Sequence, residues 1–288
     1  MLVMINKVNC IFCLYIIMKK HLKTIFAFAM AATMIFAAAG CGSSPEPTSD
    51  EQNVQSTEGE EEAEAPSESG DTLIMATNAE FPPYEFYEGG DVVGIDVEIA
   101  RAVAESMGKE LHVEDMAFDS IIPALLSGKA DIGAAGMTVT EDRKASVDFT
   151  DTYVKASQVI IVKADNTEIT GADSVEGKVI GVQLGTTGDL YASDVTDTVE
   201  RYNKGFEAVQ ALSQGKIDAV IIDDQVAKAL AADNADVKVL DEPFTEEEYA
   251  IAVKKDNAEL VEEINAALTE LKESGKLQEI VDKYITAE

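Results

Sequence analysis

The sequence predicts an α/β fold with mainly parallel sheets from Asp71 to the C-terminus. Short apolar runs alternate there with amphipathic segments of helical period, which is typical of βαβ units. A second observation is an internal repeat: residues 124–131 and 211–218 both have the pattern A-L-x-x-G-K-x-D. Each copy leads from a helix through a glycine into an apolar strand. This arrangement fits two similar α/β lobes, and 288 residues suffice for one large or two modest domains.

The elements follow in order from apolar runs and from helix-terminal residues. In the first half, Asp96 and Asp119 are expected as N-caps, and Gly108 and Gly128 as C-terminal stops. The strands expected there are 73–76, 111–114 and 130–135, and the helices are 97–107 and 120–127. In the second half, strands are expected at 179–183, 201–203 and 219–222, with helices from about residue 187, at 206–214 and at 225–232.

The formal net charge of −32 is unevenly distributed along the chain. Residues 1–40 contain no acid, and their bases include the stretch 18–23. An uncharged run at 24–39 follows and ends in small residues, which is the order of a secretory signal peptide. The run is shorter than the about 20 apolar residues of a spanning helix. Because the segment from Met18 is a complete signal by itself, we expect translation to start at Met18.

Gly40-Cys41 after small residues resembles a bacterial lipobox. The resemblance implies cleavage before Cys41 and lipidation of its thiol; ordinary signal cleavage beside an unrelated Cys is the alternative. Residues 41–70 contain nine acids, no base and Val54 as the only large aliphatic residue. Such a segment cannot bury enough apolar surface to fold, so a disordered acidic tether is expected. The protein is therefore expected to be extracytoplasmic and lipid-anchored to the cell membrane.

Composition also excludes several classes of function. Phosphate contacts need clustered Lys and Arg, so an acidic chain is not expected to bind nucleic acid. Two His and three Cys leave little material for a zinc site, and neither a metal nor a cofactor is expected.

In open α/β sheets, ligands bind beyond the carboxyl ends of the strands, so the repeat points to the residues that follow its two strands. In the first half these are Ala135, Gly136 and Thr138, followed by Arg143. In the second half they are Asp223 and Asp224, two adjacent aspartates. A cation with a hydroxyl on one side and carboxylates on the other would suit a zwitterion.

Several motifs in order resemble the extracytoplasmic amino-acid-binding proteins of bacterial ABC importers, the bacterial extracellular solute-binding proteins of family 3. The motifs are GIDVEIA at 94–100, FDSIIPAL at 118–125, AGMTVTEDR at 135–143, VDFT at 147–150, GTTG at 185–188 and IIDD at 221–224. The resemblance covers about residues 73–285.

The resemblance implies a two-lobed, periplasmic-binding-protein-like fold of type II with two hinge crossings. Lobe 1 would comprise 71–152 and 253–288, and lobe 2 would comprise 153–252. The hinges would lie near 153–157 and 248–252, and the lobes would close on the ligand.

The resemblance also implies roles for single residues. Arg143 would form a forked contact with the α-carboxylate of an amino acid, and Asp224 would accept from its α-ammonium. Thr138, Gly136 and Thr187 would add polar groups, the last at a helix start that favours an anion. The further expected contacts are two aromatic walls, Phe81 and Phe118, and the specificity positions Asn78, Glu80, Gln183 and Asp223.

No basic residue occurs among those specificity positions, so Asp and Glu are disfavoured as ligands. Gln, Arg, Lys, His or cystine remain. The expected function is capture of a free amino acid by a monomer, without catalysis, and delivery to the transmembrane subunits of an ABC permease. Two alternatives stay open: an enzyme of the cyclic-acid dehydratase type, which would need a positioned acid or base, and a sensing module for a signalling partner.

Overall fold

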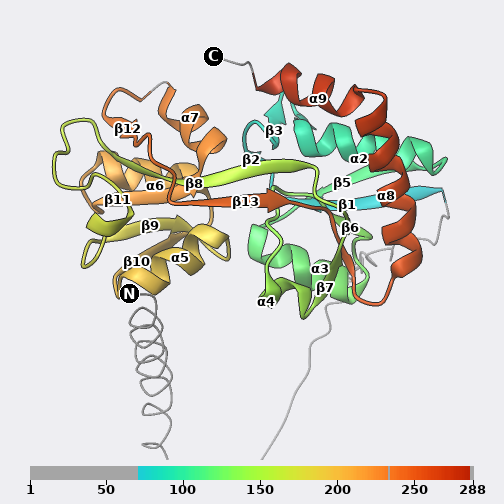
Figure 1. Ribbon diagram of the computed structural model, residues 1–288, viewed down its shortest axis with the longest axis horizontal. Helices are drawn as coiled ribbons and strands as arrows, with labels where there is room; N and C mark the ends of the chain where they lie inside the picture. The colour runs from blue at the N-terminus through green and yellow to red at the C-terminus, as the bar shows by residue number, and fades with distance from the viewer. Residues whose placement is uncertain (1–70, 233, 286–288) are drawn as a thin grey trace, which may run out of the picture. The chain divides into compact units, whose positions relative to one another are not determined.

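The computed structural model describes residues 71–232 and 234–285, shown in colour in Figure 1. The predicted signal peptide, Met18, Cys41 and the tether lie outside these residues. Within the described ranges, no helix has the length and apolar character needed to cross a membrane.

Lobe 1 is defined here by a five-stranded sheet of order β5-β1-β6-β14-β7. Its first three strands are parallel to one another, whereas β14 pairs antiparallel with both β6 and β7. The strands are β1 (Thr72–Thr77), β5 (Glu110–Asp115), β6 (Ile132–Gly133), β7 (Val147–Phe149) and β14 (Ala252–Lys254). A separate three-stranded sheet, β2 (Glu80–Phe81), β3 (Glu85–Glu88) and β4 (Asp91–Val93), adjoins this lobe and was not predicted.

Helices cover both faces of the lobe 1 sheet. Leu73 and Met75 belong to the core cluster shared with α2, α8 and α9, whereas Ala76 belongs to the cluster shared with α3. This alternation is the period of two expected for a strand buried on both faces. The helical elements are α2 (Ile95–Ser106), η1 (Phe118–Ser120), α3 (Ile121–Ser127), α4 (Glu141–Lys144), α8 (Ala258–Glu273) and α9 (Lys276–Tyr284).

Lobe 2 is defined by the sheet of order β10-β9-β11-β8-β12, with β13 also paired to β8. β9, β10 and β11 are parallel, and the pairs of β8 with β11, β12 and β13 are antiparallel. The strands are β8 (Val154–Lys163), β9 (Ile180–Gln183), β10 (Val199–Tyr202), β11 (Ala219–Asp223), β12 (Val237–Val239) and β13 (Thr245–Tyr249). The helices are η2 (Ala172–Ser174), α5 (Thr187–Val195), α6 (Gly205–Ser213) and α7 (Asp224–Ala232).

The predicted α/β fold class is therefore confirmed. Both large sheets are mixed: three neighbouring strands of each are parallel, and the remaining strand pairs are antiparallel. Two helix starts differ from the prediction. Gly94 is the N-cap of α2, and Asp96 is fully buried inside the helix, where it binds other parts of lobe 1. Asp119 lies within a 3₁₀ turn, and Ser120 is the N-cap of α3 without a side-chain cap bond.

The sequence repeat has a structural explanation in both lobes. Each copy ends a helix at a glycine with positive φ, Gly128 at 76° and Gly215 at 70°. In both, the next backbone N–H bonds back to the helix at 3.0 Å, in the manner of a helix-terminal glycine motif. The closing aspartate then accepts from a backbone N–H of the neighbouring segment at 2.8 Å: Asp131 from Ile74 within β1, and Asp218 from Val179 just before β9.

The chain passes between the two sheets twice, along β8 and β13, which run side by side in Figure 1. Tyr153 N donates to Tyr249 O at 2.9 Å, and Thr150 N donates to Ile251 O at 3.0 Å, where the segments leave lobe 1. These are the segments predicted as hinges, and their motion stays a prediction.

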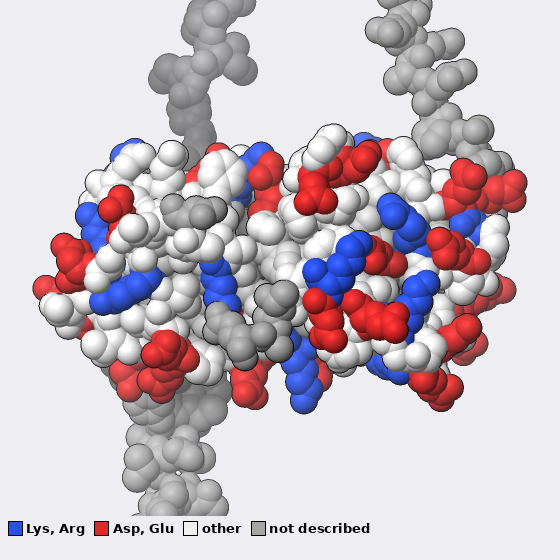
Figure 2. Space-filling view, turned by 90° about the horizontal axis from the view of Figure 1, so that it is seen from above, with Lys and Arg blue, Asp and Glu red and all other residues white. Residues whose placement is uncertain are grey.

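Acidic side chains lie on both halves of the face shown in Figure 2, most densely on the right, with Lys and Arg among them. The negative charge therefore describes a solvated exterior. The exceptions among the described residues are the buried carboxylates Glu85, Asp96, Asp189, Asp223 and Glu247, which are 1%, 0%, 7%, 4% and 6% exposed.

Candidate ligand-binding cleft

Arg143 is a buried cation between the lobes. It lies on the short helix α4, whose N-cap Thr140 accepts from Arg143 N at 3.2 Å. Nη1 donates to Thr138 O at 2.7 Å, and Nη2 donates to Gly185 O of lobe 2 at 3.2 Å. Its Cζ lies 5.2 Å from the centre of the Phe118 ring. Burial lowers the pKa of Arg143, and the negative charges of Glu247 and Asp223 oppose that shift.

Gly136 lies where the backbone approaches an aromatic ring. Its φ is 53°, and a Cβ there would meet the Phe81 ring at 3.0 Å. Gly136 N donates to Asp96 Oδ2 at 2.7 Å, and Tyr153 OH donates to the same oxygen at 2.7 Å. The predicted neighbour Ala135 is 1% exposed and packs in the core cluster under α3, so its side chain lies away from the cleft.

Glu247 joins both lobes and was not predicted. Its Oε2 accepts from Thr138 Oγ1 at 2.8 Å, from Thr187 Oγ1 at 3.0 Å and from Gln158 Nε2 at 3.1 Å. Burial and this carboxylate together raise the pKa of Tyr191 to about 12. The stretch Thr245–Tyr249 reads TEEEY, so no apolar alternation distinguishes the buried Glu247 from its exposed neighbours.

Of the two adjacent aspartates, Asp223 faces this cluster. It is the last residue of β11, and Gln158 Nε2 donates to its Oδ2 at 2.5 Å. Its buried Oδ1 has no hydrogen-bond partner in the part of the chain that the structure describes. Burial, and then the charge of Glu247, raise its pKa well above the ordinary value. Asp224 begins α7; its side chain is 21% exposed and accepts from Gln225 at 2.7 Å. The prediction assigned the α-ammonium to Asp224; in the structure Asp223 is the more buried carboxylate of the two, and the ammonium partner stays a prediction.

Strand alternation explains which aspartate is inside. Ala219 and Ile221 of β11 pack in the core cluster that contains Ala192 of α5, whereas Val220 and Ile222 pack against α6 and α7. Asp223 continues the first set, so it lies toward the start of α5. Gly188 allows the close approach, since a Cβ there would meet Ile221 O at 2.8 Å.

The far end of the cleft is closed by two polar pairs. Gln183 Nε2 donates to Asn78 Oδ1 at 2.8 Å, and Asn78 Nδ2 donates to Met116 O at 2.8 Å. Gln183 Oε1 is buried without a partner. Beside this pair, Lys204 of lobe 2 forms an ion pair with Glu80. None of the predicted specificity positions is itself basic, but Lys204, distant from them in sequence, forms an ion pair with one of them.

The two aromatic residues predicted as walls are mostly buried, and their contact with a ligand stays a prediction. Phe81 is 6% exposed and its ring centre lies 6.1 Å from that of Tyr84. Phe118 is 9% exposed and lies against Arg143. Tyr84 in turn meets Tyr249 edge to face at 5.1 Å, which connects this wall to β13.

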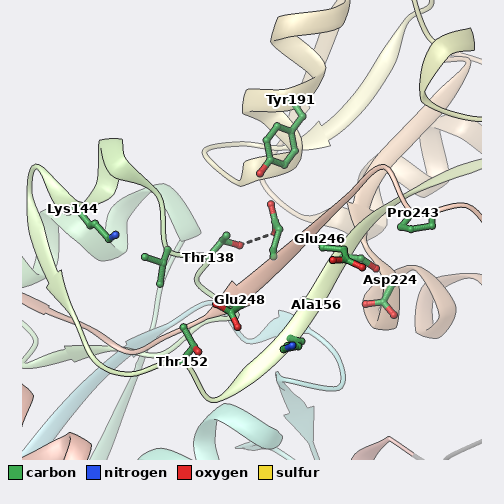
Figure 3. A pocket seen from close by; sticks show the side chains of 13 residues that line it. Thr138, Lys144, Thr152, Ala156, Tyr191, Asp224, Pro243, Glu246 and Glu248 are labelled. Carbon is green, nitrogen blue, oxygen red and sulfur yellow. Dashed lines mark hydrogen bonds between the residues drawn. The ribbon is translucent and has the colours of Figure 1, made fainter. Parts of the chain in front are cut away.

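A cavity of about 870 Å³ lies beside these residues, along β8 and β13. Figure 3 shows that its labelled side chains come from both lobes and from the strands between them, with Tyr191 pointing into it. Of the predicted site residues, Thr138 and Asp224 line it. Arg143, Asp223, Asn78 and Gln183 do not, because the lobes already contact each other directly there.

Comparison with known proteins identifies the protein family to which this fold is similar. The family model for bacterial extracellular solute-binding proteins, family 3, matches residues 73–287. The arginine-binding extracellular protein ArtP of Bacillus subtilis is 35% identical over 266 residues, which is 90% of this chain and 96% of ArtP. An ancestral arginine-binding protein bound to arginine shares 43% identity, covers 75% of this chain and 98% of its own, and has a TM-score of 0.71. The same ancestral protein bound to glutamine gives 43% identity, 75% and 99% coverage, and a TM-score of 0.72.

The chain belongs to the bacterial extracellular solute-binding proteins, family 3. The resemblance predicted from the motifs is confirmed. The family consists of solute-binding proteins and not of enzymes, which excludes the dehydratase alternative.

Proposed function

We propose that the protein captures one free amino acid between its lobes and delivers it to the transmembrane subunits of an ABC permease. The observation that carries this proposal is the opposition of two buried charges, Arg143 of lobe 1 and Asp223 of lobe 2, which are 8% and 4% exposed. Buried charges need partners of opposite sign, and an amino acid offers both.

The α-carboxylate is assigned to Arg143. A guanidinium offers planar paired donors that match a carboxylate. The start of α5, a helix of nine residues, supplies free backbone N–H groups and the Thr187 hydroxyl nearby. Thr138 supplies a second hydroxyl from lobe 1, and the Gly136 backbone borders the same site.

The α-ammonium is assigned to Asp223 in place of Asp224. Its buried, unpartnered Oδ1 is an acceptor without a donor, which costs free energy until a ligand donor arrives. Glu247 adds a second carboxylate on the other side of Gln158. An ammonium placed against Asp223 would neutralise part of this charge.

The far end of the cleft favours a ligand side chain rich in donors. Asn78 Oδ1, the free Gln183 Oε1 and the Glu80 carboxylate are all acceptors. A guanidinium, an amide, an imidazole or an ammonium would meet them, with Phe81 and Phe118 as walls. Arginine is the first candidate, because relatives named for arginine binding share 35% and 43% identity with this chain. Glutamine, lysine, histidine and cystine are the further candidates.

Closure is proposed to use the two hinge segments near 153–157 and 248–252, between lobes 71–152 with 253–288 and 153–252. The closed arrangement already contains direct contacts between lobes at Arg143 and Gly185 and at Asn78 and Gln183. A ligand that bridges Arg143 and Asp223 interacts more strongly with closed lobes, so it shifts the population toward them.

The anchoring proposal rests on the sequence alone. Translation starts at Met18, the segment from there to residue 40 directs export, Cys41 is lipidated, and residues 41–70 tether a monomeric body to the membrane. Mass spectrometry of the mature N-terminus tests this, since an unmodified N-terminal residue other than Cys41 would contradict it.

A binding screen of the mature protein against the twenty amino acids and cystine tests the main proposal. Arginine at 100 times its dissociation constant should stabilise the fold by about 2.7 kcal/mol, which a thermal-shift measurement detects. Absence of binding to every amino acid and to cystine in calorimetry would reject the proposal.

A further inference from the structure

Lys204 is a cation at the far end of the cleft, where it forms an ion pair with Glu80. The other groups there include the acceptor oxygens Asn78 Oδ1 and Gln183 Oε1. We propose that Lys204 determines the charge preference of the cleft by competing with a cationic ligand side chain for the carboxylate of Glu80. This inference rests on the proposed function, because it concerns which amino acid that cleft prefers.

The placement of Lys204 follows from strand pairing. Tyr202 of β10 lies opposite Gln183 of β9, and Lys204 follows two residues later as the N-cap of α6. In lobe 1, Glu80 N donates to Asn78 O at 2.7 Å, so Glu80 lies beside Asn78 at the far end of the cleft. The buried amide pair and the ion pair therefore lie side by side across the two lobes, the amides inside and the charges outside.

The ion pair is weak enough to be exchanged. The side chains of Glu80 and Lys204 are 28% and 39% exposed, so water competes for both. A guanidinium offers several donors in a fork that fits a carboxylate, whereas an ammonium is a point charge. An arginine side chain could therefore bind the Glu80 carboxylate and also donate to Gln183 Oε1, which has no hydrogen-bond partner among the described residues.

Lys204 has a second place to go when it is displaced. Its Nζ already lies 5.8 Å from the centre of the Phe206 ring, within the range of a cation–π contact. A neutral side chain such as that of glutamine needs no displacement, because it can meet the amide pair and leave the ion pair intact. Lys204 thus penalises arginine and leaves glutamine unaffected.

The test compares arginine and glutamine in the same variants. In mature Lys204→Met, the ratio of arginine affinity to glutamine affinity should rise about fivefold over wild type, as expected for loss of a partly exposed charge pair. In Glu80→Gln, where Lys204 is left without its partner, the same ratio should fall by about as much. Isothermal titration calorimetry gives both affinities, and Lys204→Gln serves if the methionine variant does not fold.

Lys178→Met is the matched control. Lys178 forms an ion pair with Glu168 at 2.7 Å within lobe 2, and its side chain is about as exposed as that of Lys204. The Lys178→Met substitution should leave the affinity ratio unchanged. An unchanged or lowered ratio in both Lys204 variants would overturn the inference, as would a wild-type protein that binds neither arginine nor glutamine but some other amino acid. A wild-type protein that binds no amino acid at all would instead reject the proposed function.

Discussion

Arg143 donates from Nη2 to the carbonyl oxygen of Gly185 at 3.2 Å, so a buried cation of one lobe touches the backbone of the other. The contact lies at the start of α5, where Gly185 precedes Thr187, and a Cβ on Gly185 would meet Asp119 Cβ at 3.1 Å. Arg143 therefore lies where the two lobes contact each other. Its guanidinium is held without a carboxylate bond in the described residues, which leaves its charge for a ligand.

Arg143→Ala should weaken amino-acid binding by at least about 100-fold, because it removes a charge-assisted pair of hydrogen bonds to the α-carboxylate. Calorimetry with arginine measures the effect, and circular dichroism checks the fold. Arg101→Ala is the control, since Arg101 is exposed on α2. Binding within threefold of wild type would remove Arg143 from the site.

The two adjacent aspartates give a second prediction. Asp223→Asn should weaken binding by at least about 100-fold, since it removes the buried charge assigned to the α-ammonium. Asp224→Asn should change binding by less than about threefold, because a partly exposed carboxylate already screened by water contributes little. The reverse order of effects would restore Asp224 as the ammonium partner.

The aspartate pair also shows what the sequence could and could not predict. The A-L-x-x-G-K-x-D repeat located both strands correctly, because helix-ending glycines are local signals. It could not choose between Asp223 and Asp224, because β11 is buried on both faces and its apolar run hides the alternation.

Contacts between distant segments were also beyond the sequence. Lys204 reaches Glu80 across 124 positions, and Thr138 reaches Glu247 across 109. No local sequence period identifies Lys204 or Glu247 as part of a cleft. The repeat and the position after its strand pointed to Arg143, and the resemblance of the surrounding motif to a family pattern supplied the role predicted for it.

Gly94 supports a prediction about stability. Its φ is 131°, and a Cβ there would lie 2.1 Å from Tyr84 O, so alanine must displace the backbone at the start of α2. Gly94→Ala should lower the free energy of unfolding by at least about 3 kcal/mol. Gly108→Ala also has positive φ, 69°, but open space around it, so it should cost only about 1 kcal/mol. Urea denaturation compares the two, and equal losses would show that the clash relaxes freely.

Asp96 predicts a pH dependence of stability. This carboxylate accepts from Gly136 N and Tyr153 OH, and so connects the cleft loop to the first predicted hinge. Burial raises its pKa from 3.8 to about 6, although both hydrogen bonds oppose the shift. The folded state therefore holds this proton more tightly than the unfolded state, and the contribution of Asp96 to stability falls as pH rises from about 4 to about 6.

Asp96→Asn removes that titration. The stability of the variant minus that of wild type should become more positive by about 3 kcal/mol between pH 3.5 and pH 7, whatever the pH-independent effect of the altered hydrogen bonds. Asp148→Asn is a control of opposite sign, since Lys255 lowers the pKa of Asp148 and its stabilisation is lost as pH falls. Urea denaturation from pH 3.5 to pH 7 measures both differences. A flat difference for Asp96→Asn would mean that the buried carboxylate ionises with an ordinary pKa and that its two hydrogen bonds offset the cost of burial.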